Sequence, residues 1–357
     1  MAGGGGGRAL SDPLGRDAVR AVDPGGMLDD VLAQPLQLGD ALWRAQSAGV
    51  NARDVPGGLT VCGMGGSAIG GDLAAAALGD RATRPIATVR GYALESWTAP
   101  DTLVLCSSYS GDTEETLACF DAAGAAGAER VTLTTGGRLA QAARDEGAPV
   151  IGVPAGMQPR AAVLYGTVGA LECAALAGAA PAIHSEIDAA SGLLGELVAE
   201  WGPDGAEDSA AKRLARELHG TIPVVHGAGP TVAVSRRWKT QINENAKAAA
   251  YATELPEADH NEICGWAHGR RSAPLVALFL EDPDQHPRVR RRIEVTAAEI
   301  ERTGAPALRI TARGRSRLER VLSLVLLGDL VSVYLAALSG VDPTPVNAIT
   351  RLKRALA

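Results

Sequence analysis

The segment Val61-Cys-Gly-Met-Gly-Gly-Ser-Ala-Ile-Gly-Gly-Asp72 follows a short apolar run and opens a stretch of helical character. Glycines at such a strand-to-helix turn let backbone N–H groups approach a ligand, and the N-terminus of the helix favours an anion. The spacing also matches the GxGxxA form of a dinucleotide-binding turn, which is a weak signal alone. The turn therefore predicts an α/β fold that binds an anionic group near Gly66 and Ser67.

Strands and helices alternate on both sides of this turn. Expected strands lie at 58–61, 86–90, 102–107, 130–134, 149–153, 222–226, 275–280 and 307–311. Expected helices lie at 27–48 with a break at Pro35, and at 68–77, 114–123, 138–146, 161–177, 187–197, 209–218, 231–247, 288–303, 318–338 and 346–356. This alternation indicates parallel sheets with helices on both faces. We expect two doubly wound parallel-sheet units, each a flavodoxin-like αβα sandwich.

The length of 357 residues favours two domains. We expect a flexible leader over 1–25, a first unit with a preceding helix over 26–180, and a second unit with a C-terminal helix over 181–357. The leader begins with a run of glycines and lacks the apolar core of a signal peptide. The longest apolar stretch, 321–338, contains Gly328-Asp329, which indicates a buried helix rather than a membrane span.

Charge and cysteine content narrow the class of protein further. The net charge of -7 gives no support for a nucleic-acid partner, so an anionic ligand must be held by local donors. The five cysteines are scattered and form no CxxC pair. This pattern predicts reduced, buried thiols in a cytoplasmic protein.

A second turn, Ser107-Ser-Tyr-Ser-Gly-Asp-Thr113, places several hydroxyl groups at the end of an expected strand. Hydroxyl and backbone N–H donors together suit a phosphate monoester. The alternative is a plain helix cap made by Ser110 or Asp112. A dinucleotide-binding unit places an acid at the end of the strand after the glycine turn, where it binds the ribose. Here the expected strand 86–90 ends at Arg90, which disfavours NAD and leaves NADP as an alternative.

The segment 243–262 holds five acids, a lysine, a histidine and three asparagines. A helix that only covers a core does not need this mixture. We interpret Glu244 and His260 as the proton-handling groups of an enzyme. The alternatives are a surface helix acid and a structural histidine.

Four motifs occur in order along the chain: Gly63-Met-Gly-Gly-Ser67, Ser108-Tyr-Ser-Gly-Asp-Thr113, Gln158-Pro-Arg160, and the segment 243–262. Together they resemble the bifunctional phosphoglucose/phosphomannose isomerases, which are built from two sugar-isomerase (SIS) domains. The resemblance runs from about residue 27 to the end. It implies interconversion of fructose 6-phosphate with glucose 6-phosphate, mannose 6-phosphate or both, through a cis-enediolate and without a metal or cofactor.

The resemblance also implies roles for individual residues. Glu244 would be the base, and Arg160 would stabilise the enediolate. His260 and Lys353 would open the sugar ring, with His260 reaching in from the neighbouring subunit of a cytoplasmic homodimer. The sugar phosphate would be bound by Gly66, Ser67, Ser108, Ser110 and Thr113.

One departure from the family pattern keeps alternatives open. Asp112 replaces the asparagine of the usual Ser-Tyr-Ser-Gly-Asn-Thr motif, and an acid beside a phosphate is unfavourable unless it points away or caps a helix. A non-catalytic SIS protein that binds a sugar phosphate and regulates a partner is therefore a second hypothesis. An NADP-dependent oxidoreductase is a third. The resemblance ties acceptance of mannose to a threonine near the C-terminal lysine. Thr344 and Thr350 both lie near that lysine, so glucose and mannose stay open as the aldose.

Overall fold

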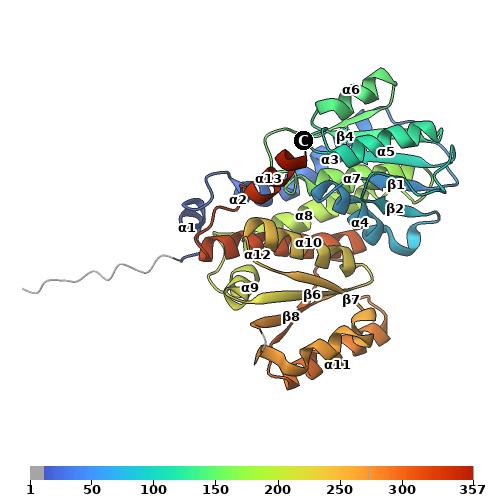
Figure 1. The fold of residues 1–357 in the computed structure, drawn as a ribbon. Coiled ribbons are helices and arrows are strands. Elements are labelled where there is room, and N and C mark those ends of the chain that lie inside the picture. Colours follow the sequence, from blue (N-terminus) through green and yellow to red (C-terminus); the bar gives the residue numbers. More distant parts are fainter. Residues whose placement is uncertain (1–11, 272, 357) are drawn as a thin grey trace, which may run out of the picture.

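The computed structural model describes residues 12–271 and 273–356 and contains two parallel sheets, one in each half of the chain (Figure 1). The first sheet has the order β2-β1-β3-β4-β5, the flavodoxin-like doubly wound order, and the second has the order β7-β6-β8-β9. The strands are β1 (Leu59–Cys62), β2 (Ile86–Val89), β3 (Leu103–Ser107), β4 (Glu129–Thr134), β5 (Val150–Gly152), β6 (Ile222–Ala228), β7 (Tyr251–Leu255), β8 (Leu275–Glu281) and β9 (Ala307–Thr311). Two doubly wound α/β units are thus confirmed.

Helices flank both sheets, and α10 and α12 pack together between the two halves and against α4. The first half contains α1 (Arg16–Arg20), α2 (Met27–Leu32), α3 (Gln34–Ser47), α4 (Gly66–Leu78), η1 (Gly79–Arg81), α5 (Glu114–Ala125), α6 (Gly137–Asp145) and α7 (Val163–Leu176). The second half contains α8 (His184–Trp201), α9 (Ala210–Leu218), α10 (Thr231–Asn245), η2 (Glu257–His260), η3 (Glu262–Arg271), α11 (Pro287–Arg302), α12 (Arg317–Leu338) and α13 (Asn347–Leu356).

The parallel register brings the two ligand-type turns to one edge of the first sheet. Cys62 at the end of β1 pairs with Cys106 near the end of β3, so the chain leaves both strands at the same level. Behind this edge α4 packs closely on α7: a Cβ added at Gly70 would lie 2.7 Å from the carbonyl carbon of Gly166. Small residues therefore set the position of the helix that begins at the glycine turn.

The N-terminal region corrects the expectation of a flexible leader over 1–25. From Asp12 onward the chain is packed: Leu14 and Val19 are fully buried, and the Asp12 carboxylate lies 2.7 Å from the ammonium group of Lys212. This ion pair attaches the segment to α9 in the second half of the chain. Met1–Ser11 lie outside the described residues.

The structure also bears on the expected burial of the cysteines and of the long apolar stretch 321–338. Four cysteines are buried as predicted, but Cys264 is exposed, because it lies in the surface segment η3. Within the described ranges, α12 is the helix long and apolar enough to cross a membrane, yet 89% of its most apolar window is buried inside the protein. It is therefore a core helix, as its interruption by Asp329 suggested.

Candidate active site

The two turns predicted to bind an anion lie against each other. The backbone N–H of Tyr109 donates to the hydroxyl of Ser67 (3.3 Å), which links the turn after β3 to the turn after β1. Within the second turn Ser108 donates to the hydroxyl of Thr113 (2.8 Å) and accepts from the N–H of Gly111 (3.1 Å). The structure thus gathers Ser67, Ser108 and Thr113 at one edge of the sheet.

In the described part of the chain, the helices that begin at these turns lack a side-chain cap, and in the first turn of α4 the N–H of Ser67 donates to the carbonyl oxygen of Met64 (3.0 Å). The residue preceding α4 is Gly65 and the residue preceding α5 is Thr113, and neither helix receives a side-chain capping bond. The first N–H groups of an α-helix need an external acceptor, and they favour an anion. The cap by Ser110 or Asp112 is therefore not formed: the Ser110 hydroxyl accepts from the N–H of Asp112 within the turn (3.2 Å).

Asp112 is engaged elsewhere. Its carboxylate accepts from the backbone N–H of Arg138 (3.1 Å) and from the guanidinium Nε of the same residue (3.4 Å), at the start of α6. The acid therefore interacts with the first turn of another helix and with a cation, which is a favourable place for a negative charge.

The glycine turn also touches the Gln158-Pro-Arg160 motif. A Cβ added at Gly66 would lie 3.0 Å from the Cα of Arg160 and 3.0 Å from the carbonyl oxygen of Pro159. A residue larger than glycine would push these two loops apart. Gly66 thereby keeps Arg160 beside the free N-terminus of α4.

Arg160 and Glu244 face each other across the junction of the two halves. The guanidinium Nη1 of Arg160 lies 3.5 Å from Oε2 of Glu244, which sits in the last turn of α10. The Arg160 side chain is 4% exposed and that of Glu244 is 27% exposed. A permanent cation and a carboxylate that solvent can reach are thus placed side by side.

The electrostatics of this pair follow from burial. Burial lowers the pKa of the Arg160 guanidinium, and the nearby Glu244 opposes that effect. On α2, burial and two neighbouring acids raise the pKa of Asp30 to about 6, while Arg160 works in the opposite direction. The region around Arg160 is therefore poorly solvated, which strengthens charge interactions within it.

Lys247 holds the end of α10 in place. It adopts a left-handed backbone conformation (φ 55°), and its ammonium group donates to the carbonyl oxygens of Glu244 and Pro343, the latter at 2.9 Å. Burial and Arg160 lower its pKa. These contacts hold the loop after α10 against the chain at Pro343.

The structure does not bring His260 or Lys353 to this pair. His260 is exposed on η2, and Lys353 is exposed on α13, a helix none of whose described residues is buried. In the described ranges no hydrogen bond or ion pair joins either side chain to Arg160 or Glu244.

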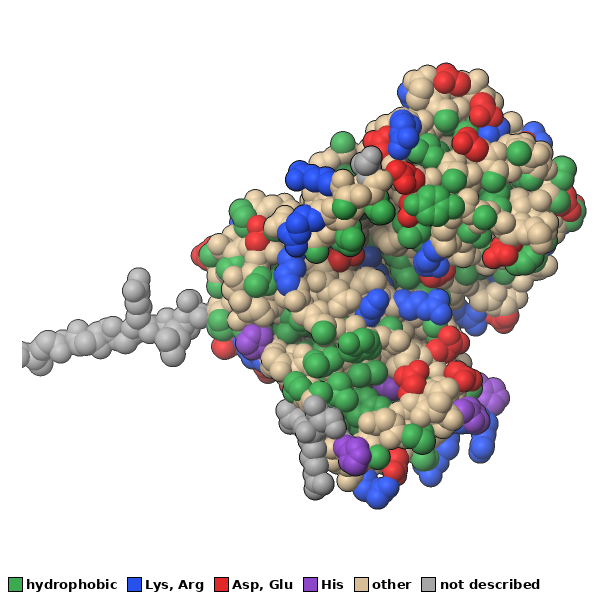
Figure 2. Space-filling model, viewed as in Figure 1, with side chains coloured by type: hydrophobic (Ala, Val, Ile, Leu, Met, Phe, Trp, Pro, Cys, Tyr) green, Lys and Arg blue, Asp and Glu red, His purple; other side chains and the backbone are tan. Residues whose placement is uncertain are grey.

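A cleft of about 500 Å³ opens between the two halves next to the glycine turn. Figure 2 shows a hollow between the halves with Lys and Arg side chains along it. The cleft is lined by Gly65, Ile69 and Arg90 from the first half and by Arg236, Lys239, Thr240, Tyr251 and Ala252 from the second. Arg90 is paired with Asp72 (2.6 Å) at the edge of this cleft.

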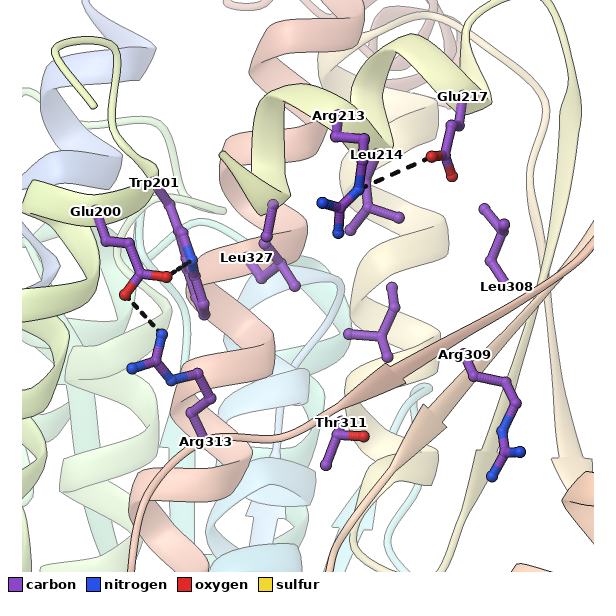
Figure 3. Close-up of a pocket in the computed structure, with 12 residues that line it drawn as sticks. Glu200, Trp201, Arg213, Leu214, Glu217, Leu308, Arg309, Thr311, Arg313 and Leu327 are labelled. Carbon is purple, nitrogen blue, oxygen red and sulfur yellow. Dashed lines mark hydrogen bonds and ion pairs between the residues drawn. The ribbon is translucent and has the colours of Figure 1, made fainter. Parts of the chain in front are cut away.

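A second groove, of about 460 Å³, lies beside β9 and α9, away from these turns (Figure 3). Four of its charged residues pair with one another, since Arg313 lies 2.6 Å from Glu200 and Arg213 lies 3.9 Å from Glu217, and Arg309 pairs with Glu281 outside the groove (2.6 Å). The groove contains none of the residues expected to act on a substrate, so the candidate site is the junction at Arg160 and Glu244.

Comparison with known proteins identifies the family. The chain is 37% identical over 336 residues to the bifunctional phosphoglucose/phosphomannose isomerase of Caldicellulosiruptor bescii, covering 93% of this chain and 99% of that protein. It is 37% identical over 300 residues to the enzyme of the same name from Aquifex aeolicus, covering 84% and 90%. This chain belongs to the bifunctional phosphoglucose/phosphomannose isomerase family. The resemblance seen in the motifs is confirmed, and the chain is an isomerase.

The family assignment agrees with two further comparisons. Residues 207–356 match the bacterial phospho-glucose isomerase C-terminal SIS domain. A solved structure of a hypothetical protein from Thermus thermophilus superposes with a TM-score of 0.70 at 16% identity, covering 97% of this chain and 95% of that one. At this identity the likeness concerns the fold alone, and it agrees with two parallel-sheet α/β units.

The motifs did not reveal how Arg160 is held. Its guanidinium bonds to Asn245, and its backbone carbonyl bonds to Arg237, which pairs with Asp329. None of these three residues was predicted as a site residue. One signal was available: Asp329 interrupts an apolar stretch, and a charge in a buried helix needs a partner. The identity of that partner depends on tertiary contacts, which the sequence pattern does not give.

Proposed function

We propose that this isomerase interconverts fructose 6-phosphate with glucose 6-phosphate, mannose 6-phosphate or both, through a cis-enediolate. The observation that carries the proposal is the placement of the Glu244 carboxylate 3.5 Å from the Arg160 guanidinium, in a chain where Gly66 links Arg160 to a turn with a free helix N-terminus.

Glu244 is the proposed base. An aldose–ketose isomerisation moves one proton between C1 and C2, so a single carboxylate on one face of the substrate can remove it and return it. In the direction from fructose 6-phosphate, Glu244 takes a proton from C1, and the electron pair moves onto the carbonyl oxygen. A proton passes from the hydroxyl on C1 to the oxygen on C2, and the carboxylic acid of Glu244 returns its proton to C2 as the C1=O bond forms.

Arg160 would balance the charge that develops in this step. The enediolate carries a negative charge on oxygen, and a buried guanidinium stabilises it more strongly than a solvated one would. Arginine keeps its proton even when buried. With this cation in place, the scheme requires no metal ion.

The phosphate group would bind at Gly66, Ser67, Ser108, Ser110 and Thr113. Free N–H groups at the starts of α4 and α5, together with the hydroxyls, provide donors for its oxygens. Binding this remote group supplies energy that orients the reacting carbons. The position of Asp112 against Arg138 supports this assignment, because the carboxylate is bonded to α6.

Ring opening would fall to His260 and Lys353. Both side chains are exposed in the single chain, which agrees with a homodimer in which His260 serves the neighbouring subunit's site. We place this dimer in the cytoplasm, without a membrane or nucleic-acid partner.

A coupled assay on the purified chain tests the proposal. Fructose 6-phosphate is supplied, and glucose 6-phosphate and mannose 6-phosphate are measured separately, with kcat/KM determined for both aldose phosphates. Turnover to at least one of them is expected. Binding of fructose 6-phosphate without turnover would favour the non-catalytic regulator and contradict the proposal.

A further inference from the structure

Most of the donors of the Arg160 guanidinium are committed to the protein. Nε donates to Oδ1 of Asn245 (2.6 Å), and Nη2 donates to the carbonyl oxygens of Pro343 (2.7 Å) and Thr344 (3.0 Å). Nη1 donates to Oε1 of Gln158 (3.4 Å) and faces Oε2 of Glu244 at 3.5 Å. The orientation of the guanidinium therefore decides which N–H edge is offered to a substrate oxygen.

Asn245 links this guanidinium to α12. Its Nδ2 donates to the hydroxyl of Ser332 (2.9 Å), and that hydroxyl donates to the carbonyl oxygen of Asp329 (2.7 Å). Asn245 and Ser332 are both fully buried. The amide therefore has one strong partner at each end and is held in a single orientation.

A buried ion pair closes the network on the other side. Arg237 donates to the two oxygens of Asp329, from Nε at 3.0 Å and from Nη2 at 2.6 Å, and both side chains are 1% exposed. Nη2 of Arg237 also donates to the backbone carbonyl of Arg160 (3.0 Å). Gln34 on α3 adds a bond to the Asp329 carboxylate (2.6 Å).

Stability alone does not account for this arrangement. A buried ion pair contributes little net stability, since an apolar pair of the same volume is often as good or better. Here the bonds instead converge on one residue: Asn245 fixes the guanidinium of Arg160, and Arg237 fixes its backbone. Hydrogen bonds of this kind, around a catalytic group, keep it in the geometry that the transition state needs.

We propose that Asn245 and the Arg237–Asp329 pair are positioning residues for Arg160, which aim its Nη1 edge at the enediolate oxygen formed beside Glu244. The inference rests on the proposed isomerase function and deepens it. It predicts that loss of the network weakens stabilisation of the enediolate while binding of the ground-state sugar phosphate is kept.

The first test is Asn245→Ala, assayed with fructose 6-phosphate. We expect kcat to fall between about tenfold and a hundredfold, with KM within about threefold of wild type, because one misaimed donor loses that much transition-state stabilisation. Ser235→Ala is the matched control. Ser235 is buried on the same helix, and among the described residues its side chain bonds only to the carbonyl of Val232 (2.9 Å), so the turnover of Ser235→Ala should match wild type.

Binding of two substrate analogues separates positioning from general loosening. Arabinonate 5-phosphate carries a planar carboxylate in place of the enediolate, whereas sorbitol 6-phosphate has none. In Asn245→Ala the affinity for arabinonate 5-phosphate should fall in proportion to kcat, and the affinity for sorbitol 6-phosphate should stay within about threefold of wild type. An equal loss for both analogues would overturn the inference.

A double variant guards against misfolding. Arg237→Met with Asp329→Leu removes both charges together, which preserves folding better than removing one. We expect a folded protein whose kcat is at least tenfold lower, with Arg237→Lys showing a smaller loss. If wild type turns over and both Asn245→Ala and the double variant keep its kcat, the positioning role is wrong. If wild type itself does not turn over, the proposed function fails instead.

Discussion

A buried cation, Arg160, lies beside a partly exposed carboxylate, Glu244. Arg160 is 4% exposed and Glu244 27% exposed, so the guanidinium has lost most of its water while the carboxylate can still reach a substrate. A buried charge needs bonds to remain favourable, and Arg160 has them from Asn245 and the 343–344 carbonyls. The same bonds leave one edge of the guanidinium for the reaction.

At the scale of single residues, Asp112 gives a clear prediction. Because its carboxylate is bonded to Arg138, Asp112→Asn should change KM for fructose 6-phosphate by less than about threefold. The loss of a surface contact at a helix start should cost at most about 1 kcal/mol of unfolding free energy. Steady-state kinetics and urea unfolding measure the two quantities. A tenfold or greater fall in KM would mean that the acid opposes the phosphate after all.

The sequence predicted the individual chemical groups better than their mutual contacts. Arg160 and Glu244 were expected together, and they lie together. The pairing of Arg237 with Asp329, 92 residues apart, was not expected, because residue type does not say which distant charge neutralises a buried one. Roles for His260 and Lys353 stay predictions, since both are exposed in the single chain.

At the scale of elements, apolar periodicity predicted most helices and strands closely. β7 (Tyr251–Leu255) was missed because it is an edge strand with one buried residue, so it lacks the apolar run that marks a parallel strand. Packing of α1 was missed because it depends on the distant contact between Asp12 and Lys212.

The sheet of the second half carries a built-in acid sensitivity. His226 on β6 is 2% exposed and stacks on Phe279 with ring centroids 4.5 Å apart, and both ring nitrogens lack a partner in the described part of the chain. Burial lowers the pKa of His226 to about 4, although Asp259 acts in the opposite direction. The unfolded chain, with a pKa near 6.5, therefore binds this proton more readily than the folded chain.

Above pH 6.5, neutral His226 contributes fully to the free energy of unfolding. As the pH falls from about 6.5 to about 4, that free energy decreases by about 3 kcal/mol in total. His226→Phe should remove this part of the acid sensitivity. Urea unfolding between pH 4 and 7, followed by far-UV circular dichroism, measures it. His219→Gln, a substitution at an exposed histidine, is the control. If the free energy of unfolding of His226→Phe depended on pH as in wild type, this account would be contradicted.

In the whole molecule, the residues proposed to act on the substrate come from both halves. Arg160 precedes α7, whereas Glu244 lies on α10, so neither half contains the pair alone. Helix α8 packs against α3 as well as α12, which ties the halves together. We keep the boundary near residue 180 as a proposal for two structural units that form one site.

A subunit-mixing experiment tests the proposed dimer. If His260 serves the partner subunit's site, a heterodimer of Glu244→Gln and His260→Ala chains has one complete site, formed by Glu244 of the second chain and His260 of the first. Differently tagged chains, coexpressed and purified through both tags, should then recover about half of the wild-type turnover per dimer. A heterodimer as inactive as the two parent variants would show that His260 acts within its own subunit.

Glu244 is proposed to move the proton between C1 and C2, and exchange of that proton with solvent reports on this step alone. Fructose 6-phosphate is incubated with the enzyme in deuterated water, and exchange at C1 is followed by proton NMR. Glu244→Gln should slow exchange at least about a hundredfold while fructose 6-phosphate binding stays near wild type, because general-base catalysis contributes that much. Glu217→Gln, in the remote groove, should exchange like wild type. Exchange by Glu244→Gln at more than about a tenth of the wild-type rate would contradict the assignment of the base.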